Sequence, residues 1–365
     1  MPSAAHFLRE YLRPAAGSTL GEDVLYERAA DQVEATIHRP ATQRGTLPGW
    51  VVLHGLTRPG RRHPALVRFA RAVARAGNVV MVPEIPEWRE LRVAPAITIE
   101  TIRAAVAALR QRGDVDRSHV GLLGFSFGGT QALIAAADEC TAGQLHGLAS
   151  WGGYADLRRV FRFGLTGLHE LDGVTYALRP DPYGAWIIAA NYLTHAPGYS
   201  GTEAVARALY ELALESGERR VYAWDPLYDP LKRRLRESLP PDQREVFDLI
   251  APLTSAPAPE LARTEALADT IAETALRLDP MLDPQPYLPA VRVPVLVAHG
   301  RDDRLIPFSE SVRLARTLPA RQLVNVTITS LFQHSGGTQS GLGPVGMARE
   351  GLRFLLLLRG LLRMV

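Results

Sequence analysis

The sequence predicts an α/β protein in which a mostly parallel β-sheet carries helices on both faces. Three observations predict this fold class. Between residues 50 and 149, short apolar strand patterns alternate with amphipathic helix patterns, as expected of parallel strands joined by crossover helices. One strand pattern runs through a Gly-x-Ser-x-Gly turn at residues 124–128 into a helix. After residue 157 the alternation gives way to helical patterns separated by prolines.

The elements of the first half follow from their periodicity and from the residues that end them. The predicted order is a helix within residues 1–20, two strands within 24–39, a strand at 50–53, a helix at 66–76, a strand at 79–82, a helix at 97–110, a strand at 120–123, a helix at 130–137 and a strand at 145–149. Gly77 and Gly113 follow the helices at 66–76 and 97–110, as glycine commonly does at a helix end. Six strands are therefore expected before residue 150.

The middle of the chain is organised differently. Helical patterns occur at residues 202–215, 231–239 and 261–278, and the stretch is far too long for an ordinary connection between a strand and a helix. Its aromatic residues either line an apolar pocket or form the core of a helical unit: Phe161, Phe163, Tyr176, Tyr183, Trp186 and Tyr192. We predict that residues 1–156 and 285–365 form one unit and that residues 157–284 form a helical layer covering Ser126.

The last part of the chain returns to strand patterns. Residues 293–297 and 324–328 read as strands, and the run at 354–358 is apolar. This run is too short to span a bilayer. It predicts a buried final helix that offers a face for self-association, with the oligomeric state left open.

The turn around Ser126 is the segment with the clearest chemistry. Gly124 and Gly128 remove side chains that would clash where the strand and the helix close together. The turn holds the serine hydroxyl outward and places the backbone N–H of Phe127 at a helix N-terminus, where it faces a developing oxyanion. The alternative is a structural serine that caps the helix.

Three further segments extend this pattern, and with them the sequence resembles the serine hydrolases of the α/β-hydrolase superfamily. Residues 50–57 resemble the third strand and oxyanion loop, residues 293–307 resemble the seventh strand and acid turn, and residues 324–337 lead through a strand to His334. The order serine, aspartate, histidine is the order of this superfamily. The resemblance covers roughly residues 30–155 and 285–365. It implies an α/β-hydrolase fold with an eight-stranded sheet and a helical cap inserted after the sixth strand. The core resembles the dienelactone-hydrolase and prolyl-peptidase-like branches more than the glycine-rich lipase branch.

The resemblance implies a catalytic triad. Ser126 is the expected nucleophile, and His334 is the expected general base because the unperturbed pKa of histidine lies near neutrality. Asp303 is the expected acid, since family acids usually sit three residues after the glycine of such a His-Gly turn. Asp302 and Asp156 are the alternatives. His54 and His299 each precede a glycine at a strand end and are expected to support turns.

The oxyanion hole needs a second N–H donor besides that of Phe127. The loop after His54 and Gly55 supplies it, through Leu56 or alternatively Thr57. Arg58, Arg61 and Arg62 follow directly, and either one of them binds an anionic substrate group or all three belong to a solvated loop. Glu84 and Glu87 are expected to pair with these arginines or to shape the pocket mouth. Candidates for substrate contacts are Thr57, Arg58, Phe125 and Trp151.

Composition limits the remaining function classes. The 365 residues carry a formal net charge of only +3 and show no long basic tract, which argues against nucleic-acid binding. No metal-ligand motif, phosphate loop or dinucleotide-binding spacing is present, so neither a metal nor a cofactor is expected. The single cysteine, Cys140, forms no internal disulfide and is expected to be a core thiol. The N-terminus has no apolar signal region, which predicts a cytoplasmic protein.

The predicted function is the cleavage of carboxylic esters of small molecules through an acyl-enzyme. A peptidase, amidase, thioesterase or acyltransferase would use the same triad, because leaving-group and pocket contacts decide among these reactions. A binding protein that kept the fold without turnover is the more distant alternative.

Overall fold

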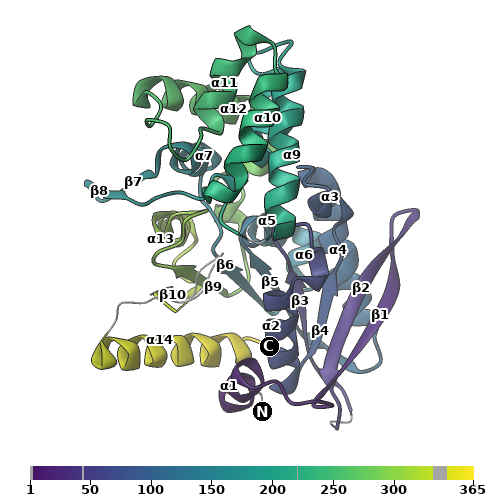
Figure 1. The fold of residues 1–365 in the computed structure, drawn as a ribbon. Helices are drawn as coiled ribbons and strands as arrows, with labels where there is room; N and C mark the ends of the chain where they lie inside the picture. The colour runs from purple at the N-terminus through teal and green to yellow at the C-terminus, as the bar shows by residue number, and fades with distance from the viewer. Residues whose placement is uncertain (1–2, 43–44, 220, 332–342) are drawn as a thin grey trace.

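The centre of the molecule is a single large β-sheet. The computed structural model describes residues 3–42, 45–219, 221–331 and 343–365. Eight strands form the sheet, in the order β1-β2-β4-β3-β5-β6-β9-β10 (Figure 1). They are β1 (Thr19–Arg28), β2 (Asp31–Pro40), β3 (Leu47–Leu53), β4 (Val79–Pro83), β5 (Val115–Phe125), β6 (Gly147–Trp151), β9 (Val295–Gly300) and β10 (Leu323–Thr329). β1 and β2 pair antiparallel, as do β2 and β4, and all other neighbours are parallel. The predicted eight-stranded, mostly parallel sheet is confirmed.

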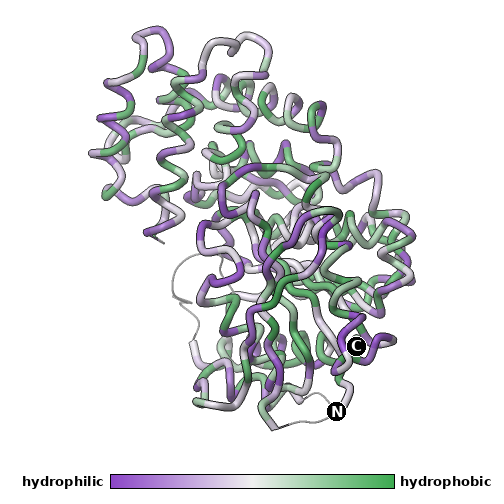
Figure 2. The backbone as a smooth tube through the Cα atoms, turned by 90° about the vertical axis from the view of Figure 1, so that its right-hand side faces the viewer, coloured by the Kyte–Doolittle hydropathy of each residue, from purple (hydrophilic) through white to green (hydrophobic). Residues whose placement is uncertain are grey.

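The central strands are apolar on both faces, as expected of strands covered on both sides. Along β3, Trp50 and Val52 belong to one buried apolar cluster, whereas Val51 and Leu53 belong to the other. This is the two-residue alternation of strand side chains. Figure 2 shows hydrophobic segments gathered in the strands at the middle of the molecule, and outer helices that alternate between hydrophilic and hydrophobic residues.

Helices cover both faces of the sheet. One face packs against α1 (Ala4–Leu12), α2 (Pro64–Arg75) and α14 (Pro344–Leu362). The other face packs against α4 (Pro95–Gln111), α5 (Phe127–Ala137) and α13 (Phe308–Thr317). Two short helices, α3 (Pro86–Arg89) and α6 (Glu139–Ala142), complete this part of the chain. The predicted end of α2 is confirmed, because Gly77 follows the helix with a φ of 106°.

A second group of elements lies between β6 and β9. It comprises α7 (Leu157–Thr166), β7 (Leu168–Leu171), β8 (Val174–Ala177), α8 (Tyr183–Tyr192), α9 (Glu203–Arg219), α10 (Asp229–Ser238), α11 (Arg244–Ile250) and α12 (Leu261–Leu278). Six short 3-10 helices complete the described elements: Gly60–Arg62, Leu193–His195, Pro226–Tyr228, Pro241–Gln243, Pro280–Leu282 and Leu288–Ala290. In Figure 1 the helices α9 to α12 stand above the sheet, at the end where α5 begins. The division of the chain into two units remains a prediction.

The hairpin of β7 and β8 was not predicted. Its turn consists of Asp172 and Gly173, with φ of 54° and 77°. Two consecutive residues with positive φ form the tight turn that favours Asp-Gly between antiparallel strands. The dipeptide was therefore a local hairpin signal inside a segment that otherwise reads as helical.

Two features of the surface bear on the expectations from composition. Cys140 is exposed in the short helix α6, so the expectation of a core thiol was wrong. In the part of the chain that the structure describes, no helix has the length and apolar character needed to cross a membrane.

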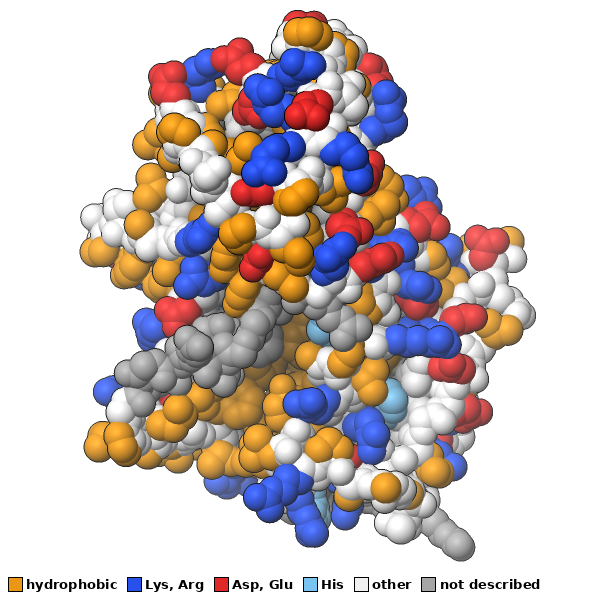
Figure 3. Space-filling view, in the orientation of Figure 1, with side chains coloured by type: hydrophobic (Ala, Val, Ile, Leu, Met, Phe, Trp, Pro, Cys, Tyr) orange, Lys and Arg blue, Asp and Glu red, His pale blue; other side chains and the backbone are white. Residues whose placement is uncertain are grey.

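The final helix α14 has an exposed apolar face. Its side chains Val345, Leu352 and Leu356 are exposed by 84%, 59% and 54%. Hydrophobic side chains gather at the lower left of Figure 3, where α14 lies. A role for this face in self-association stays a prediction.

Candidate active site

The predicted serine lies at a strained turn between β5 and α5. Ser126 has φ 57° and ψ −130°, a backbone conformation that costs an ordinary residue roughly 1–3 kcal/mol. Its N–H donates to the carbonyl of Trp151 at 2.8 Å, and its own carbonyl accepts from the N–H of Gly129 at 2.8 Å. The turn is therefore held by β6 on one side and by the first turn of α5 on the other.

The two glycines of the motif are required by close approaches of the backbone. A Cβ atom on Gly124 would lie 2.0 Å from the carbonyl oxygen of Gly128. A Cβ atom on Gly128 would lie 2.4 Å from the carbonyl oxygen of His54. Since real contacts of this kind do not fall below 3.0 Å, the strand and the helix can meet here only without these side chains. The predicted reason for both glycines is confirmed.

The loop after β3 lies directly beside the serine. A Cβ atom on Gly55 would be 3.1 Å from Cβ and 3.5 Å from Oγ of Ser126. The next residue, Leu56, lines the same cavity as Ser126 and Phe127. Phe127 is the first residue of α5, and the first N–H groups of an α-helix have no acceptor within that helix. Thr57 is turned into the loop, where its carbonyl accepts from Gly60 at 3.1 Å.

The candidate acids differ in burial. Asp303 is 1% exposed, and its Oδ1 accepts from the N–H groups of Leu305 and Ile306 at 2.9 and 3.1 Å. Leu305 and Ile306 line the cavity that contains Ser126, so the loop that fixes this carboxylate reaches the serine. Asp302 is only partly buried.

His299 supports the loop that carries Asp303. Its ring lies 2.8 Å from the carbonyl oxygen of Ile306 and 2.6 Å from Oγ of Ser311, as expected of a turn-supporting histidine.

Asp156, the third candidate acid, takes part in a structural network after β6. Its Oδ1 caps α7 by accepting from the N–H of Arg158 at 2.7 Å, and its Oδ2 accepts from Arg159 at 3.2 Å. The buried Glu310 of α13 accepts from the N–H groups of Ala155 and Asp156 and from the guanidinium of Arg159. These contacts give Asp156 and Glu310 a role in holding the chain where it leaves the sheet. His334, the expected base, lies outside the described residues.

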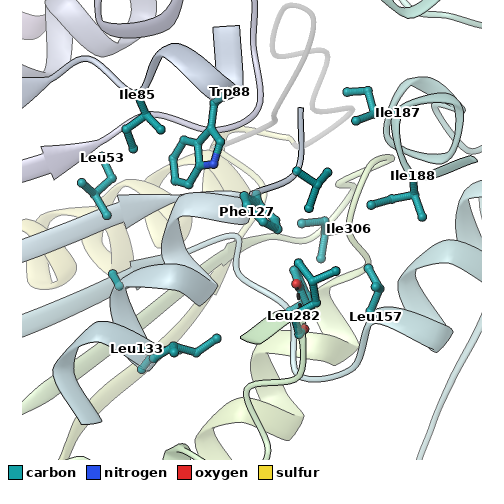
Figure 4. Close-up of a cluster of buried hydrophobic side chains, with 14 of the residues drawn as sticks. Leu53, Ile85, Trp88, Phe127, Leu133, Leu157, Ile187, Ile188, Leu282 and Ile306 are labelled. Atoms are coloured by element: carbon teal, nitrogen blue, oxygen red, sulfur yellow. Dashed lines mark hydrogen bonds between the residues drawn. The ribbon is translucent and has the colours of Figure 1, made fainter. Parts of the chain in front are cut away.

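A mostly apolar cavity opens beside Ser126. It is lined by Leu56, Ser126 and Phe127, by Leu157, Val160 and Phe161 of α7, by Ile187 and Ile188 of α8, and by Leu305 and Ile306. Figure 4 shows Leu157, Ile187, Ile188 and Ile306 around Phe127. Sequence reasoning named only Phe161 and Tyr183 among the residues from the middle of the chain that line this cavity, because apolar side chains carry no local mark of a pocket.

Polar groups in the cavity wall are few. Tyr154 donates to the carbonyl of Leu282 at 3.0 Å and Tyr183 donates to that of Leu56 at 3.4 Å. Burial, and secondly nearby carboxylates, raise the pKa of both hydroxyls, so both are neutral at ordinary pH. Asp181 also lines the cavity and accepts from the N–H of Tyr183 at 3.2 Å. Within the described ranges, no three His, Cys, Asp or Glu side chains are grouped to hold a metal ion.

Two predicted substrate contacts lie elsewhere. Phe125 and Trp151 pack against each other, with ring centroids 5.6 Å apart, and both contact Phe69 of α2. They belong to the cluster on the α1, α2 and α14 face of the sheet and are not among the described residues that line the cavity at Ser126.

The arginines after the oxyanion loop contact protein groups. Arg58 donates to the carbonyl of Arg89 at 2.8 Å and pairs with Glu218 at 3.3 Å. Arg61 is 2% exposed and pairs with Glu34, Asp23 and Glu84, and Arg62 pairs with Asp23 at 3.2 Å. The expected pairing of Glu84 with this loop is confirmed, whereas Glu87 pairs with Arg28 instead. An anion-binding role for these arginines receives no support from the contacts.

The structure is similar to several solved hydrolase structures at low sequence identity. The match to an acylaminoacyl peptidase of Pyrococcus horikoshii has a TM-score of 0.51 and 13% identity, and covers 96% of this chain but 43% of that chain. A brefeldin A esterase, described as a bacterial homologue of human hormone sensitive lipase, matches with a TM-score of 0.49 and 17% identity over 98% of this chain and 82% of that chain. Est1E from Butyrivibrio proteoclasticus matches with a TM-score of 0.48 and 12% identity over 92% and 99%.

The strand order and the peptidase match together identify the fold. The chain has the α/β-hydrolase fold that its sequence predicted. It spans less than half the length of the matched peptidase. No protein-family model matches the sequence, and no curated protein matches it.

Proposed function

We propose that this protein is a serine hydrolase that cleaves carboxylic esters through an acyl-enzyme. The observation that carries the proposal is the strained turn at Ser126, where a serine rather than a glycine occupies a positive φ beside a cavity. Strain of this kind concentrates at functional sites. A purely structural helix cap does not need it, because N-cap residues usually adopt extended backbone.

In the proposed reaction, Oγ of Ser126 attacks the ester carbonyl while His334 takes its proton. The N–H groups of Leu56 and Phe127 stabilise the oxyanion, and Asp303 stabilises the imidazolium. Collapse of the tetrahedral intermediate breaks the bond to the alkoxide, which receives the proton from His334. Water then attacks the acyl-enzyme with His334 as base, which releases the acid and restores Ser126.

The cavity wall favours an apolar substrate group beside the scissile bond. Phe161, Ile187 and Ile188 approach Ser126 from α7 and α8, and Leu305 and Ile306 approach from the acid loop. Apolar walls of this type bury hydrophobic substrate surface and exclude water from the reacting atoms. We assign this cavity to the acyl group of a small-molecule ester, with the segment 157–284 acting as the cap.

Labelling with a fluorophosphonate tests the nucleophile. Wild type is expected to form a covalent adduct on Ser126 and to hydrolyse p-nitrophenyl esters, and Ser126→Ala is expected to lose both properties while keeping its circular dichroism spectrum. An unlabelled wild type would favour a binding protein. Hydrolysis of the matching p-nitroanilide with a kcat/KM equal to that of the ester would move the assignment to an amidase or peptidase.

The same assay separates the candidate acids. Asp303→Asn is expected to lower kcat far more than Asp302→Asn, because an amide does not stabilise imidazolium and favours the wrong histidine tautomer. In a comparable triad this change costs about 10⁴ in kcat. The opposite ranking would transfer the role to Asp302, and full activity in both variants would point to Asp156.

A further inference from the structure

The buried imidazole of His54 makes a contact that bears directly on the oxyanion loop. His54 follows β3 and is 2% exposed. Its Nδ1 lies 2.7 Å from the carbonyl oxygen of Gly55. A carbonyl oxygen only accepts hydrogen bonds, so Nδ1 must carry a hydrogen and donate it. In the neutral imidazole this contact requires the tautomer that carries its hydrogen on Nδ1. The protonated imidazole carries a hydrogen on both nitrogens and can make the same contact.

The accepting carbonyl belongs to the peptide unit that presents the proposed oxyanion donor. The C=O of Gly55 and the N–H of Leu56 lie in one plane, because the peptide bond does not rotate freely. A hydrogen bond that holds the carbonyl therefore also sets the direction of the N–H. A donor on the carbonyl further polarises the unit, which strengthens the N–H as a donor to an oxyanion.

The far side of the imidazole is held by a second buried group. Nε2 lies 3.3 Å from the N–H of Ile85 and 3.4 Å from Oε1 of Glu84. The neutral ring accepts from Ile85, whereas the protonated ring donates to Glu84, and in both states Nδ1 still donates to Gly55. Trp88 meets the ring edge to face, with centroids 5.3 Å apart, and so restricts its rotation.

Glu84 is itself fixed by the loop that follows. It is 6% exposed, accepts from the N–H of Arg61 at 3.4 Å and pairs with the guanidinium of Arg61 at 3.6 Å. A Cβ atom on Gly60 would lie 2.3 Å from Oε1 of Glu84, and the φ of 53° at this position also favours glycine. Burial raises the pKa of Glu84, but the hydrogen bond and charge of His54 and the charge of Arg89 outweigh it, and the net pKa lies below the usual range.

We propose that His54 is a positioning residue that sets the oxyanion hole by holding the Gly55–Leu56 peptide, with Glu84 and Arg61 holding the imidazole. The inference rests on the proposed function, since it concerns the donor that stabilises the transition state. It explains why a buried polar network of Arg61, Glu84 and His54 ends beside the serine. His54 touches no reacting atom and acts only through the backbone.

Two substitutions at position 54 separate the two sides of the ring. His54→Asn places an amide N–H near the position of Nδ1, where it can donate to Gly55. His54→Gln places its amide near the position of Nε2, where it can meet Glu84 but leaves the Gly55 carbonyl without this donor. The expected result is a kcat for His54→Gln lower by roughly 10²-fold, the loss typical of an oxyanion-hole donor, with an unchanged KM. His54→Asn is expected to restore most of kcat.

The control is a surface histidine. His119 pairs with Asp116 at 2.8 Å near the start of β5, whereas Ser126 follows the end of that strand. His119→Gln and His119→Asn are expected to keep wild-type kinetics. A merely structural role for His54 would lower kcat in both of its variants in parallel with their thermal stability, and equal kcat values for the Asn and Gln variants would overturn the proposal. If wild type itself neither hydrolyses esters nor reacts with a fluorophosphonate, the proposed function fails instead.

Discussion

The backbone conformation of Ser126 is energetically unfavourable for a residue that carries a side chain. A φ of 57° with a ψ of −130° is uncommon for any residue other than glycine. The turn is nevertheless held by hydrogen bonds to Trp151 and Gly129, so the surrounding structure enforces it. In this conformation Ser126 lines the same cavity as Phe127, the first residue of α5. The serine therefore lowers the free energy of unfolding relative to a glycine at this position, and in return the turn carries a hydroxyl group.

This cost can be measured by comparing two substitutions. Ser126→Gly is expected to have a higher free energy of unfolding than Ser126→Ala by about 1–3 kcal/mol, because glycine adopts the positive φ without strain. Ala266 lies exposed in the interior of α12, and Ala266→Gly should lower the free energy of unfolding by roughly 0.5–1 kcal/mol. Urea denaturation gives both differences. An alanine variant at 126 as stable as the glycine variant would mean that the turn is not strained.

At the scale of elements, the cavity is formed where α7 and α8 meet the loops of the sheet. Phe161 lies on α7, Ile187 and Ile188 lie on α8, and all three line the cavity at Ser126. Other large side chains of the same segment pack within the segment. Trp186 donates to the carbonyl of Ile250 at 3.1 Å, and Phe247 of α11 is 1% exposed within the apolar cluster. Two helices of the proposed cap thus face the site while the others support them.

This arrangement predicts where acyl-chain preference is set. Phe161→Leu enlarges the cavity and is expected to shift the best p-nitrophenyl ester toward longer acyl chains. The relative kcat/KM should change by about 1–3 kcal/mol per methylene accommodated. Phe247→Leu removes a similar volume away from the cavity and should leave the profile unchanged. An identical chain-length profile in all three proteins would show that α7 does not determine acyl preference.

Local sequence patterns account for much of the sheet and for the serine turn. The strands, the glycines around Ser126 and the His299–Gly300 turn before Asp303 are all specified by residues near one another in the chain. The cavity wall is different, because it combines side chains from separate segments. Likewise the pairing of Arg61 with Glu84 and Glu34 depends on β2, β4 and a loop meeting in space. Sequence spacing cannot show such contacts. The sequence therefore could not decide whether these arginines bind an anionic substrate group or belong to a solvated loop.

For the whole molecule, one buried carboxylate joins the proposed cap to the core. Glu310 of α13 is completely buried and accepts from the N–H groups of Ala155 and Asp156 at 3.0 and 2.9 Å. Its Oε1 accepts from Nε of Arg159 on α7 at 2.7 Å. These contacts fix the chain directly after β6, where the long inserted segment begins. The same helix α13 packs on β9 and β10, so Glu310 connects three parts of the fold.

Removing this carboxylate should destabilise the whole protein. Glu310→Ala leaves the N–H groups of Ala155 and Asp156 without their acceptor and removes one of the two carboxylates that pair with Arg159. It is expected to lower the free energy of unfolding by about 3–5 kcal/mol. Glu170 pairs with Arg313 at the surface and is largely exposed, so Glu170→Ala should cost about 1 kcal/mol or less. Chemical denaturation followed by tryptophan fluorescence tests both. Equal losses would contradict the role assigned to Glu310.

The strained serine also has a consequence for the evolution of such a chain. Where a cell needs the hydroxyl of Ser126, selection must remove variants that are more stable but lack this hydroxyl. Under the proposed function, a glycine at position 126 would both raise stability and end the reaction, so a single mutation that removes the activity would also stabilise the fold. Descendants that keep the fold as binding proteins are therefore expected to carry glycine at this turn and to withstand higher temperatures than their active ancestors.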